Sequence, residues 1–147
     1  MNKFFTFILC ASLFFNCSPV NKINKVPALK NIPADMRGNF RDDYGIRYTI
    51  SDTRWIQHSN IKYHLLSYDS AGQFFIARNA ATNPGEPGLY TRIDVMRFEN
   101  MEPWYWGFCL TIYNAKTIEE AITKQKADRT NPRKGCGGYP FSRMKRE

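Results

Sequence analysis

The sequence has few of the side chains that most enzyme and metal sites use. It holds two histidines, His58 and His64, and four cysteines, none of which form a C-x-x-C pair. It contains no G-x-S-x-G, phosphate-loop, H-E-x-x-H or EF-hand pattern. No internal repeat is visible, which excludes solenoids and propellers. We therefore expect no metal site, no cofactor and no enzymatic activity.

The composition instead indicates a small basic globular domain that is rich in aromatic residues. The 147 residues are 43% hydrophobic and 15% aromatic, which is too apolar for a disordered chain. Lys and Arg exceed Asp and Glu by 21 to 13, so the formal net charge is +8. A chain of this length forms one domain, or one domain with a tail.

The N-terminus predicts an export signal. Met1-Asn2-Lys3 is a short basic start, and Phe4 to Phe15 is an uncharged run of twelve residues. A secretory signal core has roughly 7–15 apolar residues and a transmembrane helix roughly 20. Cys17 follows directly, where bacterial lipoproteins are cleaved and lipidated. We expect residues 1–16 to be a lipoprotein signal peptide and Cys17 to carry acyl chains such as palmitate. The alternatives are an ordinary signal with an unmodified cysteine, or processing at Cys10.

Residues 17–33 have the composition of a flexible tether, with three prolines, three lysines and no acidic residue. The lysines would lie near anionic headgroups, or the stretch is simply a soluble spacer. A single β-rich domain is expected over residues 34–147. An exported chain held by lipid at Cys17 is expected in a membrane, and we favour the outer membrane, on its periplasmic or surface leaflet.

The domain sequence predicts strands separated by turns. Alternating or apolar runs occupy residues 47–56, 61–65, 73–79, 89–98 and 104–113, with turn residues between them. The fold class is therefore mainly β, an antiparallel meander that forms a small barrel or sandwich. Thr117 and Glu120 make a capping box, which predicts one C-terminal amphipathic helix over residues 118–127.

Two cysteines remain once Cys10 has left with the signal and Cys17 has been lipidated. Cys109 and Cys136 are thus an even pair in an exported chain, which favours a disulfide. A metal pair or a redox pair is the alternative, but neither has supporting residues nearby in the sequence.

Several short motifs stand out along the domain sequence: Asp42-Asp43-Tyr44-Gly45, Asn83-Pro84, Pro87-Gly88, Tyr90, Arg92, Asp94, Cys109, Tyr113, Ala115, Asp128, Pro132, Gly135-Cys136-Gly137-Gly138 and Pro140-Phe141. Together they resemble an uncharacterised family of small lipoproteins from spirochaetes, Leptospira in particular, and myxobacteria. The lipobox Phe14-Phe15-Asn16-Cys17 departs from the usual pattern and is similar to the relaxed spirochaetal one. The resemblance covers residues 35–143. It implies an exported lipoprotein with a two-cysteine β-domain and brings no activity with it.

Four residues are candidate ligand contacts: Tyr90, Arg92, Asp94 and Tyr105. Arg92 and Asp94 share one face of a predicted strand, between Tyr90 and Met96. If that face points into a barrel, the two form a buried polar pair that anchors a ligand. If it points outward, which the alternation favours, they form a solvated ion pair of little energetic value. The alternation also places Trp104 and Trp106 in the core and leaves Tyr105 as an exposed aromatic.

The C-terminal residues 116–147 hold nine basic against four acidic side chains. The candidate contacts to polyanions are Lys124, Lys126, Arg129, Arg133, Lys134, Lys145 and Arg146. For an exported chain the expected partners are host matrix or plasma proteins, or anionic glycans, and not nucleic acid. We expect a membrane-anchored lipoprotein with a non-enzymatic binding domain for host or envelope macromolecules. The alternative is a lipocalin-like barrel that binds a small ligand in its lumen.

Overall fold

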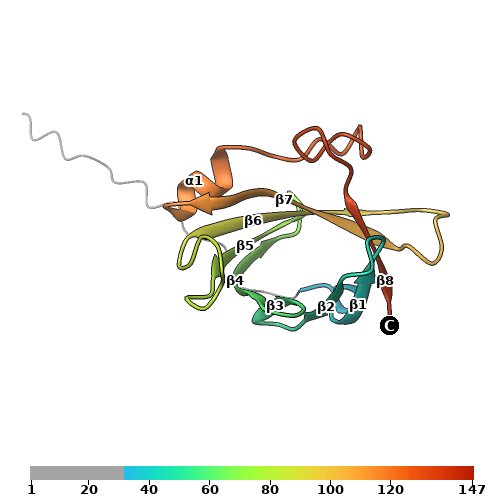
Figure 1. Cartoon of the computed structure of the whole chain (residues 1–147). Helices are drawn as coiled ribbons and strands as arrows, with labels where there is room; N and C mark the ends of the chain where they lie inside the picture. Colours follow the sequence, from blue (N-terminus) through green and yellow to red (C-terminus); the bar gives the residue numbers. More distant parts are fainter. Residues whose placement is uncertain (1–31) are drawn as a thin grey trace, which may run out of the picture.

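The computed structural model describes residues 32–147, which fold as a closed eight-stranded antiparallel β-barrel with one short helix near the C-terminus (Figure 1). This confirms the predicted fold class and selects the barrel over the sandwich. The signal peptide at residues 1–16, the lipidation site Cys17 and most of the tether at residues 17–33 lie outside the described residues.

The elements follow one another along the chain, and the longest connection lies between α1 and β8. A 3-10 helix η1 precedes the barrel, and α1 lies between the last two strands. In order they are η1 (Ala34–Met36), β1 (Gly38–Asp42), β2 (Arg47–Ile50), β3 (Arg54–Gln57), β4 (Ile61–Asp69), β5 (Phe74–Asn79), β6 (Tyr90–Arg97), β7 (Trp106–Ala115), α1 (Ile118–Thr123) and β8 (Ser142–Arg146).

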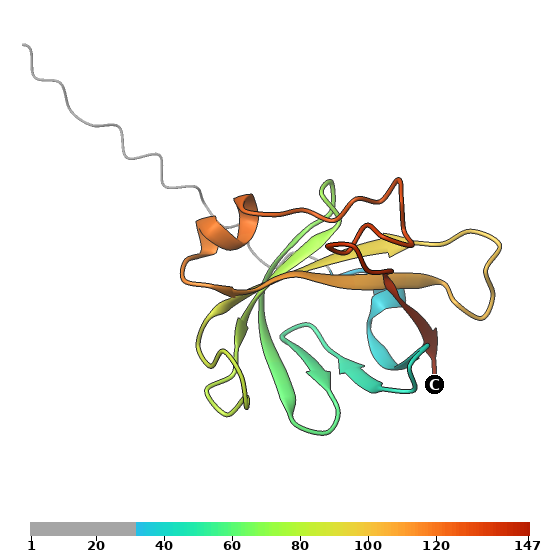
Figure 2. The ribbon, with the colours of Figure 1, turned by 45° about the horizontal axis from the view of Figure 1, so that its top comes forward.

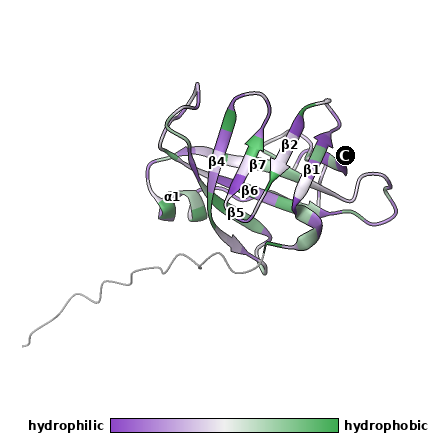
Figure 3. Ribbon diagram, turned by 90° about the horizontal axis from the view of Figure 1, so that it is seen from below, coloured by the Kyte–Doolittle hydropathy of each residue, from purple (hydrophilic) through white to green (hydrophobic). Residues whose placement is uncertain are grey.

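Each strand pairs antiparallel with the next, and β1 pairs with β8 to close the barrel, with Phe40 opposite Arg146. Hydrophobic and hydrophilic residues follow one another along the strands (Figure 3). This alternation turns one side chain inward and the next outward. Because the barrel is closed, none of the eight described strands is left as a free sheet edge.

The barrel interior is filled by aromatic side chains. Trp55 and Trp106 are each 1% exposed, and their ring centroids lie 5.8 Å apart, edge to face. The ring centroid of Phe108 lies 5.1 Å from that of Trp55, and the ring centroid of Phe40 lies 5.2 Å from that of Trp106. Edge-to-face pairs of this kind stabilise a core beyond the area they bury. Within residues 32–147, side chains therefore fill the centre of the barrel.

A second layer covers the outside of β5, β6 and β7. In Figure 2, α1 and the chain after it cross the outer face of these strands. Phe74 and Ile76 point outward from β5, yet they pack with Ala121 of α1 and are almost fully buried. Strands β5, β6 and β7 are thus buried on both faces. One face packs toward the barrel core and the other toward α1.

A disulfide holds this cover in place. Cys109 of β7 is bonded to Cys136, with their Cα atoms 5.6 Å apart, which confirms the expected pair. Ala127 and Phe141 are buried beside Cys109. The bond therefore fastens the segment between α1 and β8 to the outer face of the barrel.

The expected strand over residues 47–56 is wrong: it is two strands, β2 and β3. The Ser51 N–H donates to the Arg54 carbonyl at 2.8 Å, and the Arg54 N–H donates to Ser51 Oγ at 3.1 Å. These bonds reverse the chain and interrupt the alternation. As a result Tyr48 and Trp55, which would face opposite sides of one continuous strand, both point into the interior.

The expected helix over residues 118–127 is shorter in the structure. Its start is as predicted, because Thr117 Oγ1 accepts the Glu120 N–H at 3.1 Å, while Glu120 reaches back to the Lys116 N–H. It ends at Thr123, where the Ile122 carbonyl accepts a hydrogen bond from Arg92. Among residues 32–147, no helix is long and apolar enough to cross a membrane.

The expected strand over residues 104–113 is displaced by two residues toward the C-terminus. Trp104 lies before β7 and is half-buried, so its expected place in the core is wrong. The guanidinium carbon of Arg143 and Nζ of Lys145 each lie 5.3 Å from its ring centroid. The register between β6 and β7 is irregular, and Ile112 packs on the outside of the barrel with Phe74, Ile76 and Ala121.

Candidate functional site

Arg92 and Asp94 point out of the barrel from β6, yet their side chains are 2% and 0% exposed. The outward direction favoured from the sequence is correct, but the expected exposure to solvent is wrong. The pair does not face a lumen, and it is not solvated. It lies in the layer between the outer face of the barrel and the covering segment.

Asp94 is the centre of a hydrogen-bond network that uses both of its carboxylate oxygens. Arg92 donates to it from Nε at 2.8 Å and from Nη2 at 2.9 Å. Thr111 Oγ1 donates at 2.6 Å and Arg129 Nη2 at 3.0 Å. A buried carboxylate needs partners of this number and charge to offset its loss of hydration. Asp94 therefore anchors two arginines at defined positions.

Arg92 joins three elements. Its Nη1 donates to the Ile122 carbonyl at the end of α1, at 2.8 Å. Its guanidinium carbon lies 3.7 Å from the ring centroid of Phe74 on β5. A stacked guanidinium retains its charge while it packs against the aromatic face. Arg92 is thus held rigidly by Asp94, Ile122 and Phe74.

Arg129 comes from the chain after α1 and reaches the turn between β4 and β5. Its Nε donates to the Val95 carbonyl at 2.8 Å, and Nη2 donates to the carbonyls of Gly72 and Gln73 at 3.0 and 2.7 Å. Nη1 has no acceptor among residues 32–147. The Arg129 side chain is partly exposed, so the N–H groups of Nη1 can donate hydrogen bonds to a ligand.

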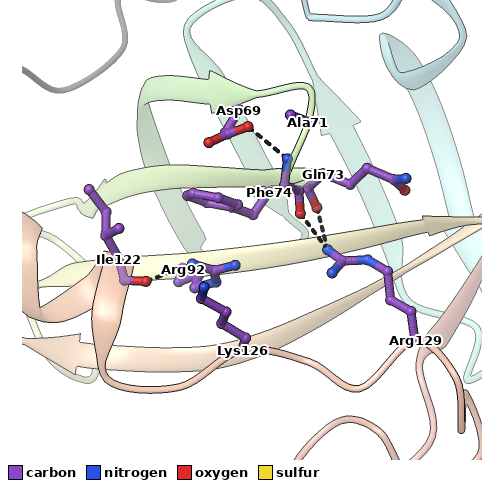
Figure 4. Close-up of a pocket in the computed structure, with 9 residues that line it drawn as sticks. Asp69, Ala71, Gln73, Phe74, Arg92, Ile122, Lys126 and Arg129 are labelled. Atoms are coloured by element: carbon purple, nitrogen blue, oxygen red, sulfur yellow. Dashed lines mark hydrogen bonds between the residues drawn. The ribbon is translucent and has the colours of Figure 1, made fainter.

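These two arginines form the base of a hollow of about 390 Å³. Lys126 enters from the covering segment, and Figure 4 shows its side chain turned toward Arg92. Asp69 lies at the opposite rim, where its Oδ1 accepts the Gly72 N–H at 2.7 Å. Asp94 and Asp69 offset two of the three positive charges. We call this hollow the cationic pocket.

A larger groove of about 830 Å³ lies between the β6–β7 loop and the chain that precedes β8. Met96, Phe98 and Phe141 line it, together with three arginines. Two of these have acidic partners: Arg97 pairs with Asp35, and Arg143 with Asp43 at 2.8 Å. The hydrogen bond from Arg97 also lowers the pKa of Asp35. The charges of this groove are therefore mostly compensated.

The structure does not bring the four candidate ligand residues together. Tyr90 is half-buried under α1, near the Arg92–Asp94 pair. Tyr105 is 56% exposed, and its carbonyl accepts the Phe98 N–H at the opposite end of the β6–β7 pair. Tyr105 is therefore outside the site that contains the other three.

The seven candidate polyanion contacts are also divided. Lys126 and Arg129 line the cationic pocket, while Lys124 pairs with Glu120 at 2.8 Å on the exposed side of α1. Arg133 lines the groove, and Lys134 lies in the exposed turn beside it. Lys145 and Arg146 are on β8, where they flank the rings of Trp104 and Phe40. The basic sequence segment does not form one continuous surface.

Sequence analysis missed three contributors to the site: Thr111, Phe74 and the Ile122 carbonyl. Thr111 and Phe74 act through contacts between neighbouring strands, and only the Ile122 carbonyl comes from the chain that folds back over the barrel after β7. A sequence signal existed for Phe74 alone. It begins the apolar run Phe74-Phe75-Ile76-Ala77, which is typical of a strand buried on both faces.

The described residues hold no group of three or more His, Cys, Asp or Glu side chains placed to bind a metal ion. His58 Nε2 lies 2.9 Å from Thr49 Oγ1, and His64 is exposed on β4, so both lie away from the cationic pocket.

Comparison with models of known protein families, with curated proteins and with solved structures finds no match.

Proposed function

We propose that the protein is an exported lipoprotein, anchored by acyl chains on Cys17, whose barrel is a non-enzymatic domain that binds anionic groups of envelope or host macromolecules. The cationic pocket carries this proposal. It places Arg92, Arg129 and Lys126 around one hollow, above a single buried carboxylate. The N-terminal residues 1–17 and the resemblance to spirochaetal lipoproteins support the location.

The filled interior favours binding on the outside of the barrel over the lipocalin-like alternative. Lumen binding needs an open cavity, but Trp55, Trp106 and Phe75 occupy the centre and are each 1% exposed or less. An external hollow with fixed charges is more accessible to a large partner. A glycan or a protein surface could reach it without passing between strands.

The arrangement of charges supports binding rather than proton transfer. Both oxygens of Asp94 are engaged by Arg92, Thr111 and Arg129, so this carboxylate has no free lone pair directed at a substrate. Arginine remains charged at all physiological pH values. The pocket thus presents a constant positive charge, which suits recognition of phosphate, sulfate or carboxylate groups.

Lipidation is tested by replacing Cys17 with Ser and partitioning cell extracts in a phase-separating detergent. The wild-type protein should enter the detergent phase, and Cys17→Ser should stay in the aqueous phase. A Cys17→Ser protein that still enters the detergent phase would show that the anchor is not at this cysteine.

Anion binding is tested on immobilised heparin with a salt gradient, using the Cys17→Ser protein so that acyl chains do not contribute. Lys126→Ala should elute at lower salt than its parent, because one of the pocket's three cations is lost. Lys124→Ala is the matched control. It removes the same charge two residues away, on the exposed side of α1, where Lys124 pairs with Glu120.

The comparison of the two lysine variants decides between a pocket and a diffuse basic surface. Elution of Lys126→Ala well before Lys124→Ala supports the pocket. Equal elution of the two variants would mean that net charge alone controls retention, and the proposal would fail.

A further inference from the structure

A second hollow, of about 490 Å³, lies at one mouth of the barrel. Its floor is formed by Tyr63 and Leu110, which pack with the side chains that fill the barrel. Its rim is formed by Gln57 at the end of β3, Tyr113 near the end of β7, and the loop between β5 and β6. It is separate from the cationic pocket, with which it shares no lining residue.

Two buried asparagines fix the shape of this mouth. Asn79 Nδ2 donates to the carbonyls of Glu86 and Tyr113, at 2.9 Å each, and its Oδ1 accepts from Thr91 at 2.5 Å. Asn83 accepts the Lys62 N–H and donates to the Lys62 carbonyl, both at 2.9 Å. The loop over the mouth is thus fastened to β7 and β4. A rim held this way loses little entropy when a ligand binds.

The polar groups that remain free at the mouth are neutral or acidic. Tyr63 is 6% exposed, and its hydroxyl has no hydrogen-bond partner among residues 32–147. Burial raises the pKa of Tyr63, so its phenol stays protonated and can donate. Gln57 and the hydroxyl of Tyr113 likewise have no side-chain partner in the described part of the chain. A hydroxyl that reaches a hollow without a protein partner is a group to which a ligand can hydrogen-bond.

Glu86 is the one charged side chain that lines the hollow, and its backbone φ is 53°. Residues other than glycine seldom adopt this left-handed conformation, which carries a steric cost. The chain nevertheless keeps an acidic residue at the rim, where Asn79 Nδ2 holds the backbone carbonyls of Glu86 and Tyr113 together. Carboxylates accept hydrogen bonds from hydroxyl groups, and they repel anions.

We propose that this mouth is a binding site for a neutral saccharide unit. An amide, two phenols and a carboxylate offer the donors and acceptors that sugar hydroxyls need, and Leu110, Pro84 and the Tyr113 ring offer apolar surface for the sugar C–H groups. The absence of a cation among the lining residues, with Glu86 present, disfavours the anionic ligands proposed for the cationic pocket.

The experiment is saturation-transfer NMR on the Cys17→Ser protein, with cellobiose, maltose and the disaccharide of N-acetylglucosamine as separate probes. At least one probe should receive saturation from the protein. Tyr63→Phe keeps the core ring and removes only the hydroxyl, so it should weaken binding about tenfold. Tyr113→Ala should also weaken it.

Tyr105→Ala is the control for Tyr113→Ala, because the two tyrosines are 56% and 53% exposed and only Tyr113 lines the mouth. Tyr105→Ala and Lys126→Ala should both bind sugar as the parent does, which separates this site from the cationic pocket. Absence of transfer to all three sugars would overturn the proposal. So would binding that Tyr63→Phe and Tyr113→Ala leave unchanged, with folding of each variant verified by its thermal unfolding.

Discussion

Arg92 and Asp94 form a bidentate ion pair on the outside of a β-barrel, and both side chains are nevertheless buried. They are buried because α1 and the chain after it lie over β6, and Arg92 holds that cover through the Ile122 carbonyl. The ion pair and the covering segment therefore depend on each other. This dependence makes the cationic pocket a rigid feature of the fold.

Replacing Arg92 with Leu should destabilise the protein by about 3–5 kcal/mol, because Asp94 then loses its main partner while it stays buried. The double variant Arg92→Leu/Asp94→Leu should recover part of this loss, since no uncompensated charge remains. Unfolding in urea, monitored by tryptophan fluorescence, measures both effects. If the double variant is less stable than Arg92→Leu, the pair is not coupled as described.

Removing the disulfide with Cys109→Ala/Cys136→Ala should lower the melting temperature by roughly 10 °C or more. The two cysteines are 27 residues apart, and a loop of that size corresponds to about 3–4 kcal/mol in the chain-entropy model. Limited proteolysis should then cleave first between α1 and β8. Equal melting temperatures for the wild-type and double-alanine proteins would contradict this role.

Acid should weaken the contact between η1 and β6. The hydrogen bond from Arg97 lowers the pKa of Asp35 below its ordinary value of about 3.8. The resulting stabilisation is fully present above the unfolded-state pKa, which is about 3.9 for Asp, and is lost as the pH falls through the lower folded value. Asp35→Asn should therefore be less stable than wild type at neutral pH, and this difference should disappear at low pH.

The control for this prediction is Glu102→Gln, in the exposed loop between β6 and β7. It should leave the melting temperature unchanged at both pH values. A destabilisation by Asp35→Asn that is as large in acid as at neutral pH would show that its cause is not the charge of Asp35.

The filled interior has its own test. Wild-type protein should not take up a fluorescent fatty acid, because Trp55, Trp106 and their neighbours leave no lumen for it. Trp55→Ala should open a cavity, cost about 3–5 kcal/mol and admit a small apolar probe. Uptake of the fatty acid by the wild type, with quenching of its tryptophan fluorescence, would favour the lipocalin-like alternative.

Features that depend on neighbouring residues were predictable from the sequence. Strand alternation and turn clusters indicate the meander, and Thr117 marks the start of α1. Cys109 and Cys136 are the two cysteines that the signal peptide and the lipidation site do not use, which indicates the bond between them. Other features lacked a local signal. Ser51 to Thr53 turns the chain without Gly or Pro, so local patterns predict one strand where the structure has the β2–β3 hairpin.

The environment of the candidate site was beyond local patterns. Both sequence-based alternatives for Arg92 and Asp94 assumed that the outside of the barrel faces water. Their burial follows from a segment some 30 residues later in the chain, which supplies the Ile122 carbonyl and Arg129. Arg129 was expected on the surface as part of a basic segment, and its position under the β4–β5 turn results from the same cover.

The central claim, that the cationic pocket binds anionic groups, is tested most directly by an NMR titration of the ¹⁵N-labelled Cys17→Ser protein with a sulfated heparin disaccharide. We expect the largest shifts at residues 71–73, at Ile122 to Lys126 and at Arg129, which surround the pocket, and we expect Lys126→Ala to reduce them. Shifts confined to Arg133, Lys134, Lys145 and Arg146, or no shifts at all, would contradict the claim.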